Sequence, residues 1–581
     1  MAFATKESKA ILAARAARAV DRMADFDSKT LLEKCEQIWE ASKSTQKDEV
    51  DVRRESPVFR VFTSAMTLKH VASNVLSYDL EWIENDTGTG STVHFAEEQE
   101  AQWLVDIYTR VAAGEGEAPI LVADYVGARW SGILDNVAIE ETSDGDQIVT
   151  ATWINDYEQL KWLLCWPTPF FPAAIQFKAW ILVGPTDWCA STTLHMNLWR
   201  KQSSSIPLTN DPIASMTGVS NWPIVVTPKS FALSAAGGSL WSMPIIRMKT
   251  WHDAFETSLA DAEMHVEVTR WIAGDDPPWP GASLRSGTLV VNIVDKSGRY
   301  NTGTAEGGNL FSGLSETIAS ITTDFIDTLF TSVNNTIPGE YMVIGQKSTN
   351  KTMPYVIFRP GYTPGCISAM FRVTPAKGTQ IITGGKSMPG VNEAISATIQ
   401  AIGDIIGDNL TVFGYGVGSI GGAIDTLLKP LYEDTILAWT QTLSAGRVAR
   451  HGWSALYEWF QDGADQAYTL NSLVVIRTGL WATRRQMTHE MKIMDACPWI
   501  IGDRGVGHIW LGDRVGTTQP RDDSGRVWVD RIKKISLSAD ESTWHPEWDV
   551  SIGSDEEEDP FMKSMRRIRE IASGMHDLGL A

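Results

Sequence analysis

The sequence has little positive charge and no long apolar run, and each shortage argues against a class of protein. Lysine and arginine number 50 against 71 aspartates and glutamates, which gives a net charge of −21. Nucleic-acid binding needs a basic face that neutralises phosphates, so we expect no specific nucleic-acid contact. No apolar run approaches the roughly 18 residues of a membrane-spanning helix, and the start lacks the pattern of a secretory signal. We therefore expect a chain that is soluble when synthesised.

Cysteine is also scarce. The five cysteines stand far apart, and no Cys-x-x-Cys pair occurs. This spacing implies neither a disulfide framework nor a zinc site, and we expect no metal and no cofactor. The thiols are predicted to be buried small apolar groups. They are Cys35, Cys165, Cys189, Cys366 and Cys497.

The chain is long and contains many hydrophobic residues. With 581 residues, 43% of them hydrophobic, it is long enough for three or four domains, because single cores stop growing near about 250–300 residues. An alanine-rich basic segment opens it and predicts an exposed helical arm. Residues 26–41 predict an amphipathic helix with Asp27 or Ser28 as its N-cap. Its apolar positions, which need a partner surface, are Leu31, Leu32, Cys35, Ile38 and Trp39.

From about Val50 the pattern becomes alternating and predicts the strands of a small barrel. A helix over Glu97–Val111 interrupts the strands, and Asp144-Gly145 is predicted to be a hairpin turn. The tryptophan-rich stretch 155–200 follows, in which three prolines rule out one regular element. It predicts a helix over Asn155–Leu164, a strand around Ala179–Val183 and a helix from about Asp187.

Residues 201–250 have little periodicity, which predicts an extended arm lying across another surface. Order resumes with a predicted helix over 252–263 and strands over 264–272 and 288–298, separated by a loop with an exposed Trp279. Residues 303–332 predict an amphipathic helix after a glycine-rich start, and further strands predict a second β-rich unit.

A glycine-rich apolar segment lies between about residues 395 and 428. It contains a GxGxxG match, but no alternating βαβ series surrounds it and no ribose-binding acid follows, so we do not expect nucleotide binding. Two interpretations stay open: an ordered lumen or interface loop, or a segment that contacts a lipid bilayer after a trigger. The candidate gate or membrane-contact residues are Gly403, Gly407, Phe413, Gly414, Gly416, Gly418, Gly421 and Gly422.

The C-terminal third predicts helices and then a β module. Two or three helices after Asp434 are expected to pack through Trp439, Trp453, Trp459 and Trp481. Gly-Asp-Arg recurs at 502–504 and 512–514, which predicts a hairpin whose aspartates cap turn amides and whose arginines pair locally. Strands over 526–539 and 547–553 close the module, before an acidic linker and a terminal helix.

A search for catalytic motifs finds none that specifies an enzyme. His489-Glu490 is not followed by the second histidine of a zinc protease motif, and no GxSxG sequence occurs. Acids such as Asp135 and Glu140 belong to strand ends, where such residues are common. We therefore expect no enzymatic activity.

Several motifs, in this order, resemble the central hub or tail-tip minor tail proteins (baseplate-hub, Tal-type) of mycobacteriophage-like siphophages of actinobacteria. None is diagnostic alone, and together they cover most of 26–553. Besides stretch 155–200 they are HDAFETSLADAE, DDPPWPGASLRSGTLVVNIVDKSG, EGGNLFSGL, LKPLYEDTILAW, GWSALYEWFQDGADQAYTLNSL and GLWATR.

The resemblance implies an α+β multidomain fold of barrel-like, ring-forming hub domains with inserted helices and a C-terminal β module. We predict the following units: an N-terminal arm over 1–45, a first β-rich hub domain over 46–155, a tryptophan- and proline-rich clamp over 156–250, a second hub domain over 251–390, the glycine-rich and helical segment over 391–482, the β module over 483–553, and the acidic linker with its helix over 554–581.

The resemblance also implies a function. It predicts a structural virion protein, made in the host cytoplasm, that forms a homotrimeric hub at the distal tip of the tail. The hub joins tube to tip, contacts other tip proteins and the tape measure protein, and gates DNA exit. A transient contact with the host envelope is a further expectation. The alternatives are a receptor- or wall-binding tail protein and, third, a tail-associated wall hydrolase.

Overall fold

The architecture was established from a computed structural model and is a mixed α+β fold, as expected. It describes residues 30–141, 145–203, 219–236, 239–297, 354–363, 366–384, 411–412, 415–416, 439–461, 479–480, 482–493, 499–504, 507–518, 527–540, 542–543 and 545–552. Among these residues, no helix is both long and apolar enough to cross a membrane.

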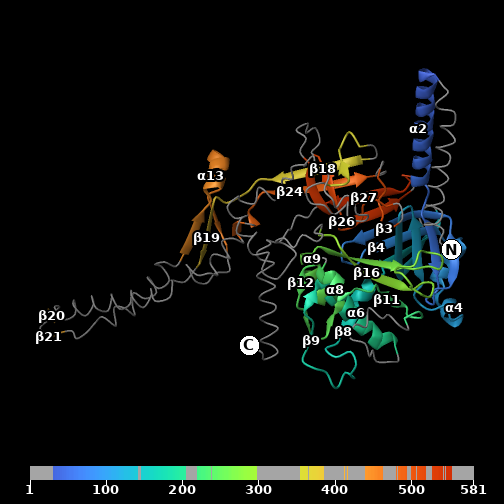
Figure 1. Cartoon of the computed structure of the whole chain (residues 1–581), viewed down its shortest axis with the longest axis horizontal. Coiled ribbons are helices and arrows are strands. Elements are labelled where there is room, and N and C mark those ends of the chain that lie inside the picture. Colours follow the sequence, from blue (N-terminus) through green and yellow to red (C-terminus); the bar gives the residue numbers. More distant parts are fainter. Residues whose placement is uncertain are drawn as a thin grey trace.

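The chain enters this fold through helix α2 (Leu31–Arg53), which projects from the body in Figure 1. The predicted N-cap at Asp27 or Ser28 is wrong, because Thr30 takes that place. The Thr30 hydroxyl accepts from the Glu33 amide, and the Glu33 carboxylate accepts from the Thr30 amide at 2.8 Å. This reciprocal capping box satisfies two amides that a helix start leaves open. The helix also runs well beyond the predicted end at residue 41.

Thirteen of the described strands form one curved sheet. Its first part has the order β3-β4-β7-β6-β5-β1-β2 and contains a long hairpin, β6 with β7, that pairs Glu141 with Gln147, as the turn prediction required. The predicted helix over Glu97–Val111 is divided at Asp106, whose side chain accepts from the Thr109 amide and starts a new helix. The elements are β1 (Val58–Phe62), β2 (Leu68–Ala72), β3 (Val75–Ile83), β4 (Thr89–Phe95), α3 (Gln99–Val105), α4 (Ile107–Ala112), β5 (Ile120–Tyr125), β6 (Ala128–Glu141) and β7 (Gln147–Asn155).

The same sheet continues into strands from the far end of the chain. Strand β26 pairs antiparallel with β3, joining residues more than 400 positions apart in one ladder. The order across the sheet is β18-β24-β27-β26-β3-β4-β7-β6-β5-β1-β2, with β25 on β26 and β17 on β25. The added strands are β17 (Ile357–Phe358), β18 (Cys366–Thr374), β24 (Gln486–Ile493), β25 (Arg514–Thr517), β26 (Trp528–Ala539) and β27 (Glu547–Ile552).

One core lies against this sheet and contains side chains from both ends of the chain. Trp82 of β3 contacts Trp510 and Trp548 with ring centroids 5.3 and 5.8 Å apart. Trp130 and Trp153 are fully buried in it. Burying such large rings contributes heavily to stability. The sheet and this core therefore fix the C-terminal strands to the N-terminal ones.

The described residues of 156–297 pack into a second core around helix α6. The predicted helix over Asn155–Leu164 is shorter, because Leu164 already belongs to a strand, and the helix expected from Asp187 is confirmed. The elements are α5 (Glu158–Lys161), β8 (Leu164–Cys165), β9 (Trp180–Ile181), β10 (Gly184–Pro185), α6 (Thr186–Gln202), β11 (Ile224–Val226), α8 (Phe231–Ala236), β12 (Trp241–Ser242), β13 (Ile245–Ile246), β14 (Lys249–Thr250), α9 (Trp251–Asp261), β15 (Met264–Arg270) and β16 (Leu289–Asp295).

The described part of 201–250 corrects another prediction. Instead of an extended arm without regular structure, its short strands β12, β13 and β14 pair with β10, β9 and β8 of the same unit. Trp279, expected to be exposed, packs partly buried against the second core. Apolar side chains of this unit thus pack against the unit's own core.

A small three-stranded sheet lies apart from the large one in Figure 1 and corrects the helical prediction after Asp434. Trp439 and Trp459, predicted on helices, stand on its strands, and Trp453 is fully exposed instead of packed. The elements are β19 (Gln380–Gly384), β22 (Trp439–Leu443), α13 (Ala445–His451), a 3₁₀ turn η5 (Gly452–Ser454) and β23 (Glu458–Phe460). Trp481 lies outside the described residues.

Candidate functional site

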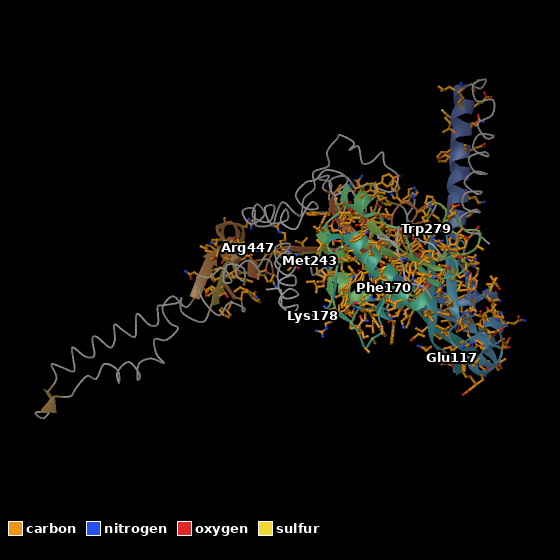
Figure 2. All side chains as sticks on the ribbon, turned by 60° about the horizontal axis from the view of Figure 1, so that its bottom comes forward. Glu117, Phe170, Lys178, Met243, Trp279 and Arg447 are labelled. Carbon is orange, nitrogen blue, oxygen red and sulfur yellow. The ribbon has the colours of Figure 1, made fainter. Side chains whose placement is uncertain are left out.

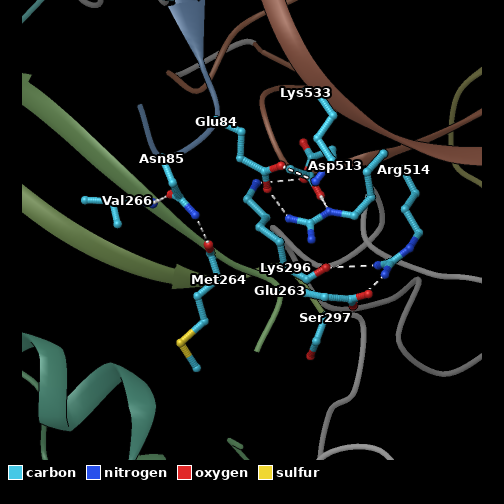
Figure 3. Close-up of polar contacts among 12 residues, drawn as sticks. Glu84, Asn85, Glu263, Met264, Val266, Lys296, Ser297, Asp513, Arg514 and Lys533 are labelled. Atoms are coloured by element: carbon cyan, nitrogen blue, oxygen red, sulfur yellow. Dashed lines mark hydrogen bonds and ion pairs between the residues drawn. The ribbon is translucent and has the colours of Figure 1, made fainter. Parts of the chain in front are cut away.

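The most concentrated polar feature is a charged junction where residues 263–297, the strands β25–β26 and the end of β3 meet (Figure 3). At its centre the Lys296 ammonium lies 2.7 Å from Asp513 Oδ1, and both side chains are buried. Asp513 Oδ2 also accepts from the Trp510 amide at 2.8 Å. We call these residues the Lys296–Asp513 cluster. It also includes the charged side chains of Glu84, Glu263, Arg514, Arg531 and Lys533.

Arginines complete the cluster. Arg514 donates to the Lys296 carbonyl at 2.9 Å and to Glu263 Oε2 at 2.6 Å. Arg531 forms an ion pair with Glu84, which also binds Lys533 at 2.8 Å. The cluster therefore joins three stretches that are remote in sequence. Buried charges persist only when paired in this way.

The electrostatics of Lys296 follow from these contacts. Burial alone lowers the pKa of a lysine, but Asp513 and Glu267 outweigh it, and the pKa of Lys296 is raised. The ammonium is therefore charged at neutral pH.

Asn85 makes the junction continuous with strand β15. It follows β3 with φ of 55°, a left-handed conformation that asparagine tolerates better than most residues. Its side chain donates to the Met264 carbonyl at 2.7 Å and accepts from the Val266 amide at 2.8 Å. The side-chain amide of Asn85 thus bonds to the backbone of β15 as the backbone of a neighbouring strand would.

A second buried group, the Arg129–Asp275 cluster, ties the large sheet to the same unit. Arg129 of β6 donates to Asp275 Oδ2 at 2.5 Å and to the Arg270 carbonyl at 2.8 Å. Arg270 in turn binds Asp156 through two bonds, at 2.5 and 2.7 Å. Burial and the neighbouring Arg129 lower the pKa of Arg60 to about 10.

The two Gly-Asp-Arg repeats contribute to both clusters, which corrects their predicted role. Asp513 does cap a turn amide, as expected, whereas Arg514 pairs with Glu263, which is far away in the sequence. Arg504 lies 3.9 Å from Asp275. In the described part of 501–514 no hairpin joins the repeats, and the bridge between Ile501 and Ile509 is parallel. The repeats are structural, and their partners come from far along the chain.

The predicted gate residues fall almost entirely outside the described part. Gly416 is described: it lies in β21 (Tyr415–Gly416), which pairs with β20 (Thr411–Val412) far from the large sheet in Figure 1. Gly403, Gly407, Phe413, Gly414, Gly418, Gly421 and Gly422 lie outside the described residues. Gly416 thus lies on a strand of a short antiparallel pair.

The thiols offer no activated nucleophile among the described residues. Burial raises the pKa of both Cys165 and Cys189 to about 12, so neither forms a thiolate at neutral pH. Their burial confirms the prediction, whereas Cys35 is exposed on α2 and Cys366 is half-buried. Cys497 lies outside the described residues. The described part also contains no cluster of three or more side chains suited to a metal.

Exposed apolar side chains form the other notable surfaces. Helix α2 presents Leu31, Leu32, Ile38 and Trp39, and the exposed fraction of each residue is between 49% and 80%. Trp453, Tyr457 and Trp459 are exposed around the small sheet. The sequence predicted the apolar positions of α2, but it gave no sign of Glu84, Glu263 or Lys296 as cluster members.

Comparison with known proteins places the chain among phage proteins. A sequence model of the family described as Siphovirus ReqiPepy6 Gp37-like protein matches residues 58–554. Two relatives, each called minor tail protein Gp28, come from Mycobacterium phages L5 and D29. They are 29% and 28% identical over 604 aligned residues, covering 95% of this chain and 99% of each relative.

Two solved structures of tail proteins show only weak similarity. The tail protein from Neisseria meningitidis MC58 has a TM-score of 0.34 and 10% identity, covering 86% of this chain and 97% of that one. The 43 kDa tail protein of prophage MuSo2 from Shewanella oneidensis has a TM-score of 0.35 and 8% identity, covering 85% and 98%. These scores are too low for a common fold to be inferred.

Proposed function

The chain belongs to the siphovirus ReqiPepy6 Gp37-like family and is a structural minor tail protein of a siphovirus, and we propose that it forms the trimeric hub of the distal tail tip. In this role it joins the tail tube to the tip, contacts other tip proteins and the tape measure protein, and gates DNA exit. No catalytic step is part of the proposal.

The observation that carries the proposal is the exposed apolar stripe of α2. Leu31 and Ile38 stand seven residues apart, as do Leu32 and Trp39, so all four side chains lie along one side of the helix. A helix that projects from the body with such a stripe is stabilised when other helices cover it. Three copies of α2 packed around an axis satisfy this requirement.

The large sheet supports assembly into a ring. Its terminal strands are β2 and β18, and neither outer edge pairs with another strand in the described part of the chain. Exposed Leu68 and Val71 lie on β2, and Met370 and Val373 on β18. Two unlike edges are suited to head-to-tail contacts, which close into a ring when the rotation allows. The net charge of −21 suits a lumen that repels phosphate groups.

The glycine-rich residues 403–422 remain our candidate for the moving gate. A gate needs an element with two stable arrangements, and glycine permits the backbone changes involved. If the trimer is imaged, these residues should lie on its axis. A position on the outer surface would remove them as the gate.

The decisive measurement is the mass of the full-length protein by light scattering, followed by imaging. We expect a mass of three times 64.0 kDa and a ring with a central channel. Replacing Leu32 and Trp39 with serine should reduce the mass to that of one chain. The matched control replaces Leu233 and Phe231, exposed apolar residues of α8, and should leave the trimer intact. A monomer that remains monomeric alongside the neighbouring tail proteins would contradict the hub.

A second candidate function, binding of host-surface glycans, is favoured by the small sheet. Trp453, Tyr457 and Trp459 present exposed rings there, and aromatic faces stack on sugars. A pull-down with isolated host cell wall tests it. Binding that is lost in W453A/Y457A and kept in L32S/W39S would favour this function over a purely structural one.

A further inference from the structure

The described residues of 156–297, which we call the second unit, form a body of their own beside the large sheet. In Figure 1 this unit lies below strands β26, β3 and β4; in Figure 2 Phe170 and Trp279 mark it, and Glu117 marks the first part of the sheet. Within the described part of the chain, its apolar core shares no residue with the core of the large sheet. Each body therefore has a core that does not depend on the other.

The buried apolar cluster that spans the two bodies is small. Among the described residues it consists of four buried side chains and two partly buried ones. Ile272 comes from the second unit, and Phe62, Ile120 and Val122 come from the sheet. Contacts between domains that lack a large apolar area commonly allow the domains to move relative to each other.

Polar side chains join the two bodies at both ends of β15. At its start, Asn85 bonds to the Met264 carbonyl and to the Val266 amide, and the Lys296–Asp513 cluster lies beside it. At its end, Arg129 donates to the Arg270 carbonyl and to the Asp275 carboxylate. The second unit is thus docked through hydrogen bonds and ion pairs at two places.

Separating a junction of this kind differs from mutating it. Removing one partner leaves a buried charge without its counterion, which is costly. Separation instead carries both partners of each pair into water, where hydration replaces the attraction that is lost. The ion pairs therefore fix one geometry, yet the junction can open without exposing the core of either body.

His265 is the group at this junction that links its geometry to pH. It pairs with Val294 across β15 and β16, so its side chain lies on the same side as Lys296, two residues further on. It is 3% exposed, and its Nδ1 finds no hydrogen-bond partner among the described residues. Burial, together with the nearby cations Lys296 and Arg531, holds the pKa of His265 well below its ordinary value.

The other charged groups around His265 are those of the Lys296–Asp513 cluster and Glu267. Glu267 stands two residues along β15 on the same side, and burial raises the pKa of its carboxyl. Protonation of Glu267 as the pH falls therefore favours the docked arrangement, whereas protonation of His265 opposes it. The contribution of His265 is consequently measured as the difference between the wild type and a variant that lacks the imidazole.

We propose that the second unit undocks from the large sheet as a folded body, and that proton uptake by His265 favours the undocked arrangement. In that arrangement water reaches the imidazole, and its pKa returns toward the ordinary value of about 6.5. The contribution of His265 to docking is therefore complete above that pH and declines as the pH falls below it. The proposal does not depend on the trimeric hub, because every contact involved lies within one chain.

The test is hydrogen exchange of the full-length protein, read by mass spectrometry with fragmentation to single residues. The Val266 amide is the reporter, because it donates to Asn85 Oδ1 across the junction. Amides bonded within the β15–β16 ladder are the internal controls. Between about pH 6 and about pH 5, exchange at Val266, corrected for its intrinsic rate, should become up to about tenfold faster in the wild type than in H265Q. The ladder amides should stay protected.

Two further variants separate undocking from local fraying. D275N removes a carboxylate from Arg129 at the far end of β15. It should also speed exchange at Val266, because the unit moves as one body. K161M is the matched control, since Lys161 pairs with Asp86, whose side chain is 49% exposed at the rim of the junction. It should change exchange at Val266 little.

Three outcomes would overturn the proposal. Val266 and the ladder amides could exchange together, in which case the unit unfolds instead of undocking. The wild type and folded H265Q could show the same pH dependence. Finally, Val266 could exchange equally in the wild type and in D275N, a comparison that does not need H265Q to fold. Light scattering of the same samples reports the trimer, so a failure of the hub and a failure of undocking are distinguishable.

Discussion

Removing one charge from the Lys296–Asp513 pair should strongly destabilise the junction. Lys296 is 8% exposed and Asp513 3% exposed, and their charged atoms lie 2.7 Å apart. In D513N the amide oxygen can still accept from the Trp510 amide, but the ammonium stays buried without its counterion. In K296M the carboxylate loses its cation. Breaking a buried pair in this way costs about 3–5 kcal/mol.

The assay is guanidinium unfolding followed by tryptophan fluorescence, with Trp510 directly beside the pair. K533M is the matched control, because Lys533 is 43% exposed in its ion pair with Glu84 and should contribute at most about 1 kcal/mol. The double variant K296M/D513N should lose less than the sum of the single losses, since no buried charge of this pair remains unpaired. Single losses no larger than that of K533M would refute the reasoning.

The pH dependence of this pair has a defined sign. The pKa of Lys296 is raised in the folded protein, so the pair's contribution to stability is fully present below the unfolded lysine pKa. It is lost only as pH rises through the raised value. The difference between wild type and K296M should therefore be constant from pH 6 to pH 9, about the neutral range in which a lysine does not titrate.

Three further predictions concern the described core and helix α2. Burial lowers the pKa of both His94 and His195 to about 4. Each histidine therefore lowers the free energy of unfolding, by up to about 3 kcal/mol, as the pH falls from about 6.5 to about 4. H94Q should flatten the pH profile of the unfolding midpoint. Gly90→Ala places a Cβ 2.7 Å from the buried Trp130 ring and should cost about 1–3 kcal/mol in the same assay. Thr30→Ala should destabilise α2 by about 1 kcal/mol, measured by circular dichroism.

Local patterns in the sequence predicted local structure well where the partner of a segment is also local. The hairpin of β6 and β7, the strands β15 and β16, and helix α6 all follow from periodicity and turn residues. Errors occurred where a nearby side chain offered a better cap. Thr30 with Glu33 starts α2, and Asp106 divides a predicted single helix in two. Both caps are visible in the sequence once their partner three residues later is considered.

The junction could not be predicted because its partners are set by the pairing of β26 with β3. That ladder brings Lys533 and Arg531 to Glu84, and it places Asp513 beside Lys296. Each of these residues alone looks like an ordinary surface charge at a strand end. The Gly-Asp-Arg repeats were recognised as structural, yet a repeat in sequence says nothing about distant partners. A one-residue slip of β26 on β3 turns every side chain to the opposite face, so the cluster and the register must form together. The charge pairs thus favour one register among those that the apolar strands alone would permit.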